Sequence, residues 1–412
     1  MNSDLKKFSI GDLTVNHDSK RIPVKEADRR PGQYPYYGAS GIVDWVDQYI
    51  FDGDFLLVAE DGENLRSRKT PVAFMASGKF WVNNHAHIVQ GNERADTRFL
   101  SYLLEGSDIS GYLTGSTIPK LSQANLNAIE VYVPGVNAQK NISHILGTLD
   151  DKIELNRKTN ETLEEIAKAL FKSWFVDFDP VRAKADGRPT GLPDEISELF
   201  PDSFEESELG EIPSGWSIGE IGDFLDLERD SVTPSDSGEE MFDHYSIPAY
   251  DEGLTPSCEA GQLIKSNKYL VTDGVFMVSK LNPRFPRIWV PSKHTTRRRI
   301  CSTEFLVCRP KVKIDAPFVL HVTKSRSVVQ QMSDLASGTS NSHQRVRPAD
   351  FVGLPFVKPS AALVKLFSEM VGPMLEKHLL TRDENQALSK TRDTLLPRLI
   401  SGELRVPDAE KM

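Results

Sequence analysis

The sequence predicts an α+β protein in which two similar mixed α/β units are separated by two long helices. We expect these helices to pair as an antiparallel coiled coil, which relates the units by an approximate two-fold axis. The first observation is a repeat: GTLDDKIELNRKTNETL, from Gly147, matches GPMLEKHLLTRDENQAL, from Gly372, without gaps. The second is that apolar residues recur at spacings of four and three along both segments, which is typical of a coiled-coil seam. The third is that similar segments also precede each helix, which indicates a duplicated unit.

Two further pairs of segments define this unit. FDGDFLLVAEDG, from Phe51, resembles VTDGVFMVSKLN, from Val271, and each reads as an Asp-Gly turn followed by a buried strand. GSTIPKLSQANLNAIEVYVP, from Gly115, resembles GTSNSHQRVRPADFVGLPFVKP, from Gly338. Each of these reads as a polar loop followed by an apolar strand that a proline closes. We therefore expect short strands among glycine and proline turns in both units, with short helices between them.

The predicted helix seams are apolar at their ends and polar in the middle. A polar residue in a seam costs stability but fixes register and partner. The alternative is that each helix packs separately on its own unit, but the narrow stripe and the repeat favour pairing. At about 1.5 Å per residue such helices would form a rod of about 55 Å, which could hold two binding units at a fixed distance. The seam residues are Ile142, Leu146, Leu149, Ile153, Asn156, Asn160, Leu163, Ala167, Leu170 and Trp174 in the first helix, and Phe367, Val371, Met374, His378, Thr381, Asn385, Leu388, Arg392, Leu395 and Leu399 in the second.

Charge is distributed unevenly along the chain. The formal net charge of −10 over 412 residues argues against a nucleic-acid partner at first sight. Acidic residues are concentrated between Asp177 and Asp230, however, and such runs are usually solvated connectors. The predicted segments are a first unit over 1–136, a first long helix over 137–179, an acidic connector over 180–212, a second unit over 213–359, a second long helix over 360–402 and a C-terminal tail over 403–412.

Other features favour a cytoplasmic protein without membrane spans. No apolar run approaches the roughly 18–20 residues that cross a bilayer, and the N-terminal sequence lacks the apolar core of a signal peptide. Three cysteines cannot all pair and have no metal-ligand spacing, which suits a reducing compartment.

The sequence carries no recognisable catalytic motif. The nearest string to the Asn/Asp-Pro-Pro-aromatic tetrapeptide of amino-methyltransferases is NPRF at Asn282, and neither a glycine-rich methyl-donor loop nor a Walker loop accompanies it. His85 and His87 are expected to face the same side of a strand, but no third metal ligand is evident, so we interpret them as a structural pair and expect no metal.

The polar loops before the two closing strands are the first candidates for DNA contact. Arg and Lys can pair with guanine or phosphate, Gln and Asn with adenine, and Ser or Thr with either. In the first unit the candidates are Ser116, Thr117, Lys120, Ser122 and Gln123, and in the second they are Ser342, His343, Gln344, Arg345 and Arg347. The alternative interpretation is a solvated surface loop.

A second candidate set consists of clustered basic residues. These could hold phosphates, although a row of Arg on a strand is often a solvated edge that blocks aggregation. In the second unit they are Lys280, Arg284, Arg297, Arg298 and Arg299; we expect their counterparts in the first unit to be Arg66, Arg68 and Lys69, with Asn83 and Asn84 as further base or phosphate contacts.

Three segments resemble a known family. SWFVDFDPVRAKADGRPTGLPDEISELFPDSFEESELGEIPSGW, from Ser173, is similar to the central region of the specificity subunit of Type I restriction–modification systems. YPYYGASGIVDWVDQYIFDGDFLLVAEDG, from Tyr34, and LTGSTIPKLSQANLNAIEVYVP, from Leu113, resemble parts of that family's target-recognition domains. The resemblance extends over essentially the whole chain.

The resemblance implies a non-catalytic DNA-recognition subunit. Each target-recognition domain would read one half of a bipartite double-stranded DNA site in the major groove. The helices would set the spacer and dock two methyltransferase subunits, which methylate adenine N6, and restriction or translocase subunits would join through them. S-adenosylmethionine, ATP and Mg are expected in these partners and no cofactor in this chain. The expected spacer and docking residues are Asn156, Asn160, Leu163, Trp174, Asn385 and Leu388.

Two alternatives belong to other classes of protein. One is a stand-alone DNA methyltransferase or nuclease, which methyl-donor binding by the purified chain would reveal. The other is a coiled-coil scaffold that binds no DNA, which a band-shift with genomic duplex over a salt series would distinguish.

Overall fold

A computed structural model describes residues 5–293, 295–337 and 344–406 of the chain. The chain forms two compact units. Unit 1 comprises Met1–Leu155 and Asn385–Met412, and unit 2 comprises Asn156–Glu384. Each of the two long helices is divided between them, so that each unit contains part of both helices. The sequence placed the helices outside the mixed α/β units, whereas the structure includes part of both helices in each unit.

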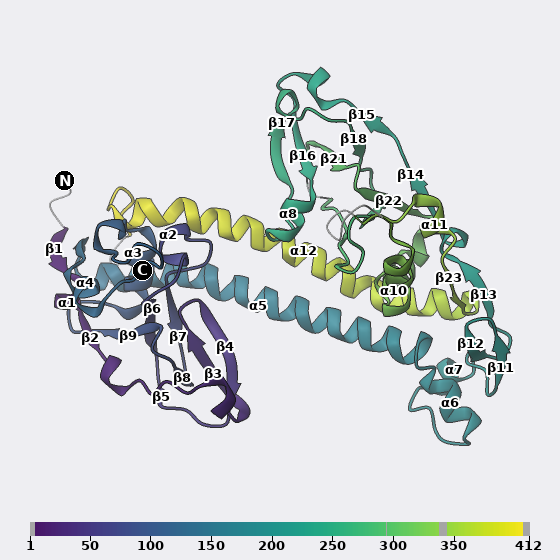
Figure 1. Cartoon of the computed structure of the whole chain (residues 1–412), viewed down its shortest axis with the longest axis horizontal. Helices are drawn as coiled ribbons and strands as arrows, with labels where there is room; N and C mark the ends of the chain where they lie inside the picture. Colours follow the sequence, from purple (N-terminus) through teal and green to yellow (C-terminus); the bar gives the residue numbers. More distant parts are fainter. Residues whose placement is uncertain (1–4, 294, 338–343, 407–412) are drawn as a thin grey trace. The chain divides into compact units, whose positions relative to one another are not determined.

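The main sheet of unit 1 has four antiparallel strands in the order β2-β9-β6-β7 (Figure 1). Strand β6, FLLVA, is buried along its whole length, because sheet neighbours flank it on both sides and helix α3 packs against it. It follows the turn that Asp52 and Gly53 form, as the sequence predicts. The elements are β2 (Thr14–Asn16), β6 (Phe55–Ala59), β7 (Ala73–Ala76), β9 (Ala86–Gly91), α2 (Asn64–Ser67) and α3 (Thr97–Gly106).

A second sheet and a closing strand pair complete unit 1. The second sheet has the order β4-β3-β8-β5, in which β3 and β8 are parallel. The closing pair joins β1 to β10 in antiparallel register, and short helices α1 and α4 pack on each other beside it. The elements are β1 (Lys6–Ser9), α1 (Ile10–Leu13), β3 (Pro31–Gly38), β4 (Gly41–Val46), β5 (Phe51–Asp52), β8 (Lys79–Val82), α4 (Gln123–Ala128) and β10 (Glu130–Val133).

Unit 2 repeats this topology strand for strand. Its main sheet has the order β14-β22-β19-β20, its closing pair is β13 with β23, and its second sheet contains β17-β16-β21-β18 with β16 and β21 parallel. One strand, β15, is added at the edge of the second sheet. The strands are β13 (Ser217–Glu220), β14 (Leu225–Glu228), β15 (Ser231–Val232), β16 (Met241–Tyr245), β17 (Ser257–Ala260), β18 (Lys268–Leu270), β19 (Phe276–Ser279), β20 (Ile288–Trp289), β21 (Arg298–Ser302), β22 (Phe305–Pro310) and β23 (Pro355–Lys358).

Short helices of unit 2 also have counterparts in unit 1. Helix α9 follows the last strand of the main sheet, as α3 does in unit 1, and α11 precedes the closing strand, as α4 does. The helices are α8 (Ile247–Asp251), α9 (Ala316–Lys324), α10 (Arg326–Leu335) and α11 (Pro348–Val352). The predicted duplication of a mixed α/β unit is therefore confirmed at the level of topology.

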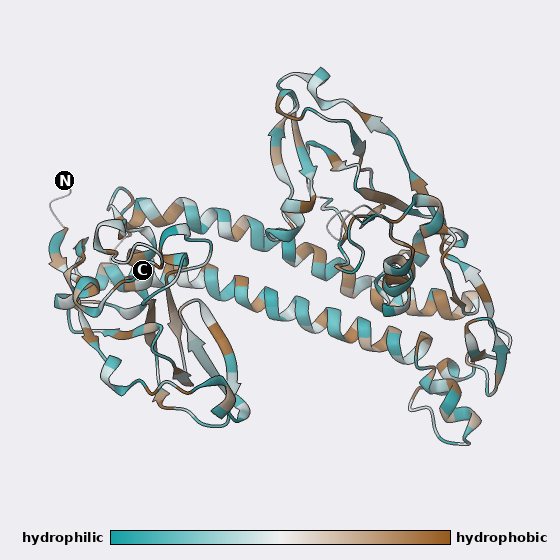
Figure 2. Ribbon diagram, in the orientation of Figure 1, coloured by the Kyte–Doolittle hydropathy of each residue, from teal (hydrophilic) through white to brown (hydrophobic). Residues whose placement is uncertain are grey.

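The long helices α5 (Val136–Phe175) and α12 (Ala361–Ile400) have the same length of 40 residues. Their surfaces are largely hydrophilic, with apolar residues recurring along each helix (Figure 2). Every predicted seam residue is buried or half-buried. The narrow apolar stripe therefore lies at a helix interface, as expected of a seam.

Contacts within each unit show that the pairing is antiparallel. In unit 1, Arg392 Nη1 lies 2.9 Å from Asp150 Oδ1, and Asn385 donates to the carbonyl of Ile153. In unit 2, Asn156 Nδ2 donates to Glu384 at 2.8 Å. Residue numbers fall along α12 as they rise along α5, so the predicted antiparallel pair is confirmed.

The acidic connector is folded rather than extended. It contains α6 (Asp179–Ala185), α7 (Asp194–Ser197) and a hairpin of β11 (Phe204–Ser207) and β12 (Gly210–Pro213). Its aromatic residues join the core of unit 2, where the rings of Phe200 and Trp174 meet edge to face at 5.2 Å. The acidic residues give the segment its charge, but the buried aromatic residues fix its structure. In the part of the chain that the structure describes, no helix is long and apolar enough to cross a membrane.

Candidate nucleic-acid interface

The loop before the closing strand of unit 1 is a short hairpin that Thr114 and Lys120 close. The backbone of Lys120 exchanges two hydrogen bonds with Thr114, at 2.7 and 2.8 Å, and bridges to Asp61 on its other side. Leu121 N donates to the carbonyl of Glu60 at 2.8 Å. The loop is therefore tied to the end of β6, and Lys120 lies where three segments meet.

The tip of this loop holds the exposed residues Ser116 and Thr117. Gly115 has φ +85°, and a Cβ there would lie 2.2 Å from the carbonyl oxygen of Ile118, so the turn requires glycine. Arg66 Nη2 donates to the carbonyl of Gly115 at 2.9 Å. Arg66 thus braces the loop that carries the other candidates.

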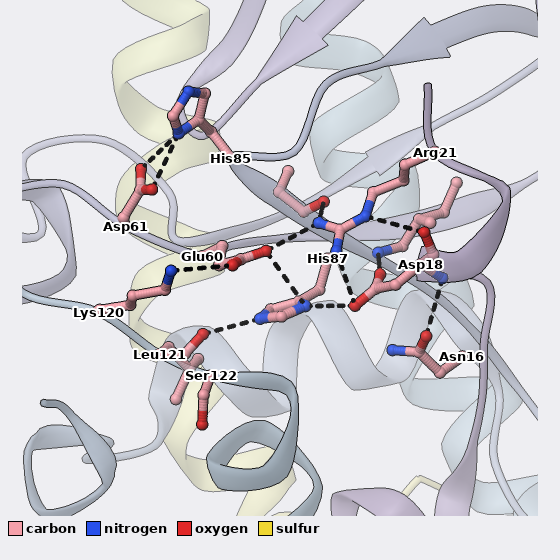
Figure 3. Close-up of polar contacts among 12 residues, drawn as sticks. Asn16, Asp18, Arg21, Glu60, Asp61, His85, His87, Lys120, Leu121 and Ser122 are labelled. Carbon is pink, nitrogen blue, oxygen red and sulfur yellow. Dashed lines mark hydrogen bonds and ion pairs between the residues drawn. The ribbon is translucent and has the colours of Figure 1, made fainter. Parts of the chain in front are cut away.

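A polar network lies beneath Lys120 (Figure 3). The carboxylate of Glu60 is 3.4 Å from Lys120 Nζ and 2.8 Å from Arg21 Nη1. The buried ring of His87 lies 2.6 Å from Asp18 Oδ2 through Nδ1 and 2.8 Å from the carbonyl of Leu121 through Nε2. These contacts connect the candidate loop to β9 and give its cation a defined position.

The charge state of Asp18 follows from its surroundings. Burial alone would raise the pKa of this carboxyl group. Hydrogen bonds from the ring of His87 and the backbone N–H of Ile88 favour the carboxylate, and its pKa is lowered. Asp18 is therefore an anion near neutral pH and holds His87 and Arg21 in place.

The two histidines His85 and His87 have separate partners. His85 is exposed in the turn before β9, with Nδ1 2.9 Å from Asp61 Oδ2, whereas His87 points into the buried network. Among residues 5–293, 295–337 and 344–406 there is no group of three or more His, Cys, Asp or Glu that could hold a metal ion.

In unit 2 the residue that corresponds to Lys120 is Arg345. Its backbone bridges to Ser337 on one side and Leu281 on the other, which reproduces the position of Lys120. Its guanidinium forms a two-point ion pair with Glu304, at 2.9 and 3.0 Å, which raises the pKa of Arg345. The carbonyl of Gln344 accepts from the N–H of Asn282 at 2.9 Å. The predicted candidates Ser342 and His343 lie outside the described residues.

Two of the residues that were predicted to contact DNA have side chains that stabilise local structure. Arg68 has φ +47°, and its guanidinium donates to the carbonyls of Glu105 and Ser107 at 2.8 and 2.7 Å, which caps the end of α3. Ser122 is the N-cap of α4, and its hydroxyl accepts from Asn125 N at 3.2 Å. Both side chains therefore already have structural partners.

The remaining candidates differ in exposure. Asn83 is buried, and its side chain accepts from His85 N at 2.7 Å. The side chains of Asn84, Lys69, Gln123 and Arg347 are exposed.

The arginines at the start of β21 form ion pairs within unit 2. Arg297 Nε lies 2.6 Å from Asp243, Arg299 Nη2 lies 2.6 Å from Asp273, and Arg298 Nη1 lies 3.2 Å from Glu240. The positive charge of these three arginines is therefore balanced by neighbouring carboxylates.

The predicted correspondence between the basic residues of unit 1 and those of unit 2 is only partly correct. The counterpart of β21 in unit 1 is β8, so Arg66–Lys69, which follow β6, do not correspond to Arg297–Arg299. They correspond in topology to Lys280 and Arg284, which follow β19. The exposed guanidinium of Arg284 lies over the ring of Phe285, 5.0 Å from its centroid.

The predicted spacer and docking residues lie in the helix pair. Asn156 and Asn385 bond across it, and the side chain of Asn160 accepts from Thr381 at 2.5 Å. Leu163 and Leu388 are half-buried. Trp174 is only 1% exposed, so it belongs to the core of unit 2.

Sequence reasoning missed the carboxylates beside the two loop cations. Glu60 and Glu304 are not among the predicted DNA contacts, which comprise basic, amide, hydroxyl and imidazole side chains. A signal was available, since Glu60 lies within the FDGDFLLVAEDG segment of the repeat, directly after its buried strand.

Family comparison gives an independent assignment. Residues 2–165 match the family model described as "Type I restriction modification DNA specificity domain". The chain is 25% identical to the HindI specificity subunit of Haemophilus influenzae, over 98% of this chain and 100% of the relative. It is 26% identical to the MjaIX specificity subunit of Methanocaldococcus jannaschii, over 98% of each chain. A putative specificity subunit of Haemophilus influenzae is 39% identical over 132 residues, which is 32% of this chain and 34% of that one.

A solved structure has the same fold. The S subunit of a Type I restriction–modification system from M. genitalium superposes with a TM-score of 0.65, covering 97% of this chain and 96% of that one at 14% identity. At that identity the match supports the fold alone.

Proposed function

The chain belongs to the family of specificity subunits of Type I restriction–modification systems, and we propose that its two units each read one half of a bipartite double-stranded DNA site in the major groove. The observation that carries this proposal is the repeated loop. Lys120 and Arg345 occupy the same place on the same topology, one in each unit. A protein with two copies of one reading surface is suited to a site with two half-sites.

The loop residues have the chemistry that reading requires. Arg and Lys donate to guanine or phosphate, and the exposed Ser116, Thr117 and Gln123 can bond base edges or phosphates. Arg66 and Lys280 lie beside the two loops and add positive charge, which attracts the phosphate backbone.

The paired helices would set the distance between the half-sites. Polar contacts in the seam, such as Asn156 with Glu384 and Asn385 with Ile153, hold one register of α5 on α12. A fixed register fixes the length of the spacer. The outer faces of these helices would dock two methyltransferase subunits.

The chemical steps would belong to partner subunits. In this proposal the partners methylate adenine N6 and bind S-adenosylmethionine, ATP and Mg, and restriction or translocase subunits join them. This chain contributes binding, orientation and the choice of sequence.

Enrichment from a random duplex library tests the proposal. The full chain, assembled with the methyltransferase subunits of its own system, should enrich two short blocks of defined sequence separated by a fixed number of undefined base pairs. Enrichment of one continuous block would contradict the reading of two half-sites. Recovery of no sequence at any salt concentration would favour the scaffold alternative.

A further inference from the structure

We propose that each loop cation and three matched positions around it determine which base pair the unit selects, so that unit 1 selects a C·G pair and unit 2 a G·C pair at one place in their half-sites. In unit 1 these four positions hold Glu60, Asp61, His85 and Lys120. In unit 2 they hold Lys280, Leu281, Glu304 and Arg345. This inference rests on the proposed reading of DNA by the two loops and extends specificity to neighbouring residues that the proposed function did not include.

The backbones at the four positions are equivalent. Leu121 N donates to the carbonyl of Glu60 at 2.8 Å, and Val346 N donates to that of Lys280 at 3.0 Å. Glu60 N in turn donates to the carbonyl of His85 at 2.8 Å, and Lys280 N to that of Glu304 at 2.9 Å. The pairs 60/280, 85/304 and 120/345 are thereby fixed by hydrogen bonds.

The fourth pair, 61/281, is fixed by two further features. Asp61 bridges to Lys120, and Leu281 bridges to Arg345 in the same antiparallel sense. The next residue has a positive φ in both units, +113° at Gly62 and +49° at Asn282. The same turn therefore carries an acid in unit 1 and an apolar side chain in unit 2.

The charges of the side chains on this shared backbone differ between the two units. Lys120 is paired with Glu60 at the end of β6. In unit 2 the residue at that place is Lys280, and the acid has moved to the turn before β22, where Glu304 holds Arg345. Both loop cations thus keep one carboxylate partner, but the partner comes from a different segment.

This pattern is expected of a reading surface. If the residues only stabilised the loop, one ion pair in one geometry would suffice for both units. Two half-sites of different sequence, in contrast, need different donors and acceptors at the same places. The main-chain scaffold stays constant while the side chains that can reach a base edge differ.

The polarity of each set indicates the base that it suits. Unit 1 presents two carboxylates, Glu60 and Asp61, which are 16% and 29% exposed in their side chains and accept hydrogen bonds. A carboxylate accepts from the N4 amino group of cytosine. Unit 2 presents Lys280 and Arg345, which donate to O6 and N7 of guanine. We therefore expect the two units to select base pairs of opposite orientation at this place.

Exchange variants test the inference in the full chain assembled with its methyltransferase subunits. The unit 1 variant is Glu60→Lys, Asp61→Leu and His85→Glu, which copies unit 2 and leaves Lys120 a carboxylate partner. The unit 2 variant is Lys280→Glu, Leu281→Asp and Glu304→His. Glu93→Lys serves as a control because its side chain is 79% exposed and lies on the surface of unit 1.

The readout is the sequence enriched from a random duplex library. The unit 1 variant should replace one C·G pair by G·C in one half-site and bind the original sequence about ten-fold or more weakly, which is the usual cost of a mismatched pair. The unit 2 variant should make the reverse change in the other half-site only. The control should keep the original motif.

The outcomes separate this inference from the proposed function. Wild-type protein that enriches no bipartite motif contradicts the proposed function. A wild-type bipartite motif that both exchange variants reproduce unchanged overturns the inference and leaves the proposed function standing. Glu60 also contacts Arg21, so thermal unfolding is measured first, and the unit 2 variant gives an independent test if the unit 1 variant is unfolded.

Discussion

At the residue scale, Lys120 and Arg345 occupy the same position in the two units, and the proposed reading of two half-sites rests on them. Each lies between two backbone bridges, which fix the position of its backbone. Each is also paired with a carboxylate, so part of its charge is balanced before DNA binds. On binding, the cation would leave its carboxylate partner and contact a base or phosphate. Its contribution to affinity is the difference in free energy between these two interactions.

Alanine at these positions should weaken specific binding without unfolding the protein. Lys120→Ala or Arg345→Ala removes one donor, and we expect affinity for the selected duplex to fall about ten-fold. Titration of labelled duplex with the assembled complex measures this. Unchanged affinity in both variants would contradict the assignment of the loops.

Arg68→Ala is the matched control for the same experiment. It removes an arginine that bonds the carbonyls at the end of α3. We expect unit 1 to lose about 1–2 kcal/mol of unfolding free energy, while the folded protein keeps its sequence preference.

A buried histidine should make unit 2 sensitive to acid. Burial lowers the pKa of His321 to about 4, and its Nδ1–H donates to the carbonyl of Pro317. In the unfolded chain its pKa is about 6.5, so the unfolded state binds a proton that the folded state excludes. The unfolding free energy should therefore fall as the pH decreases from about 6.5 towards 4.

His321→Phe tests this dependence, because the ring site lies among Phe171 and Phe367 and accepts an apolar side chain. Between pH 7.5 and pH 5.0, wild-type protein should lose about 2 kcal/mol more unfolding free energy than the variant. Denaturant titrations at the two pH values measure the difference. Equal losses in both proteins would show that His321 is protonated in the folded state.

At the element scale, the long helices combine apolar seam ends with a polar centre. The apolar residues at each end pack into the core of a unit, as Leu146 and Leu399 do in unit 1 and Phe171 and Phe367 do in unit 2. The central asparagines bond across the pair and admit one register. Stability therefore comes from the ends, and register from the middle.

Lengthening both helices tests their role as a spacer. Four residues inserted after Asn156 in α5 and four inserted before Glu384 in α12 would add about 6 Å of helix. If the helices set the half-site distance, the assembled complex should enrich a motif whose spacer is longer by one or two base pairs. A variant that folds but still enriches a motif with the original spacer length would contradict this role.

The sequence predicted these elements well where the repeat or the periodicity was strong. Both long helices, the buried strands after each Asp-Gly turn and the polar loop before the closing strand of unit 1 appear in the structure. The connector was predicted less well, because its acidic residues gave no sign that Phe200 within it, and Phe178 and Trp216 beside its two ends, are buried. Side-chain partners such as Glu60 for Lys120 come from strand pairing between distant segments and could not be read from local sequence.

At the scale of the whole molecule, duplication explains why one chain carries two sheets of the same order and two helices of the same length. The backbone around Lys120 and Arg345 is the same in the two units, and the charged side chains on it differ. If these side chains read DNA as proposed, a few substitutions in one unit would change one half-site and leave the other unaltered.

Sequencing of modified adenines in the DNA of cells that make this chain with its partner subunits tests the central claim most directly. The account predicts methylation in a motif of two defined blocks separated by a fixed spacer, with one adenine in each block. Lys120→Ala should relax the sequence of one block, and Arg345→Ala that of the other. Methylation within one continuous motif, or relaxation of the same block by both substitutions, would contradict the reading of two half-sites by two equivalent units.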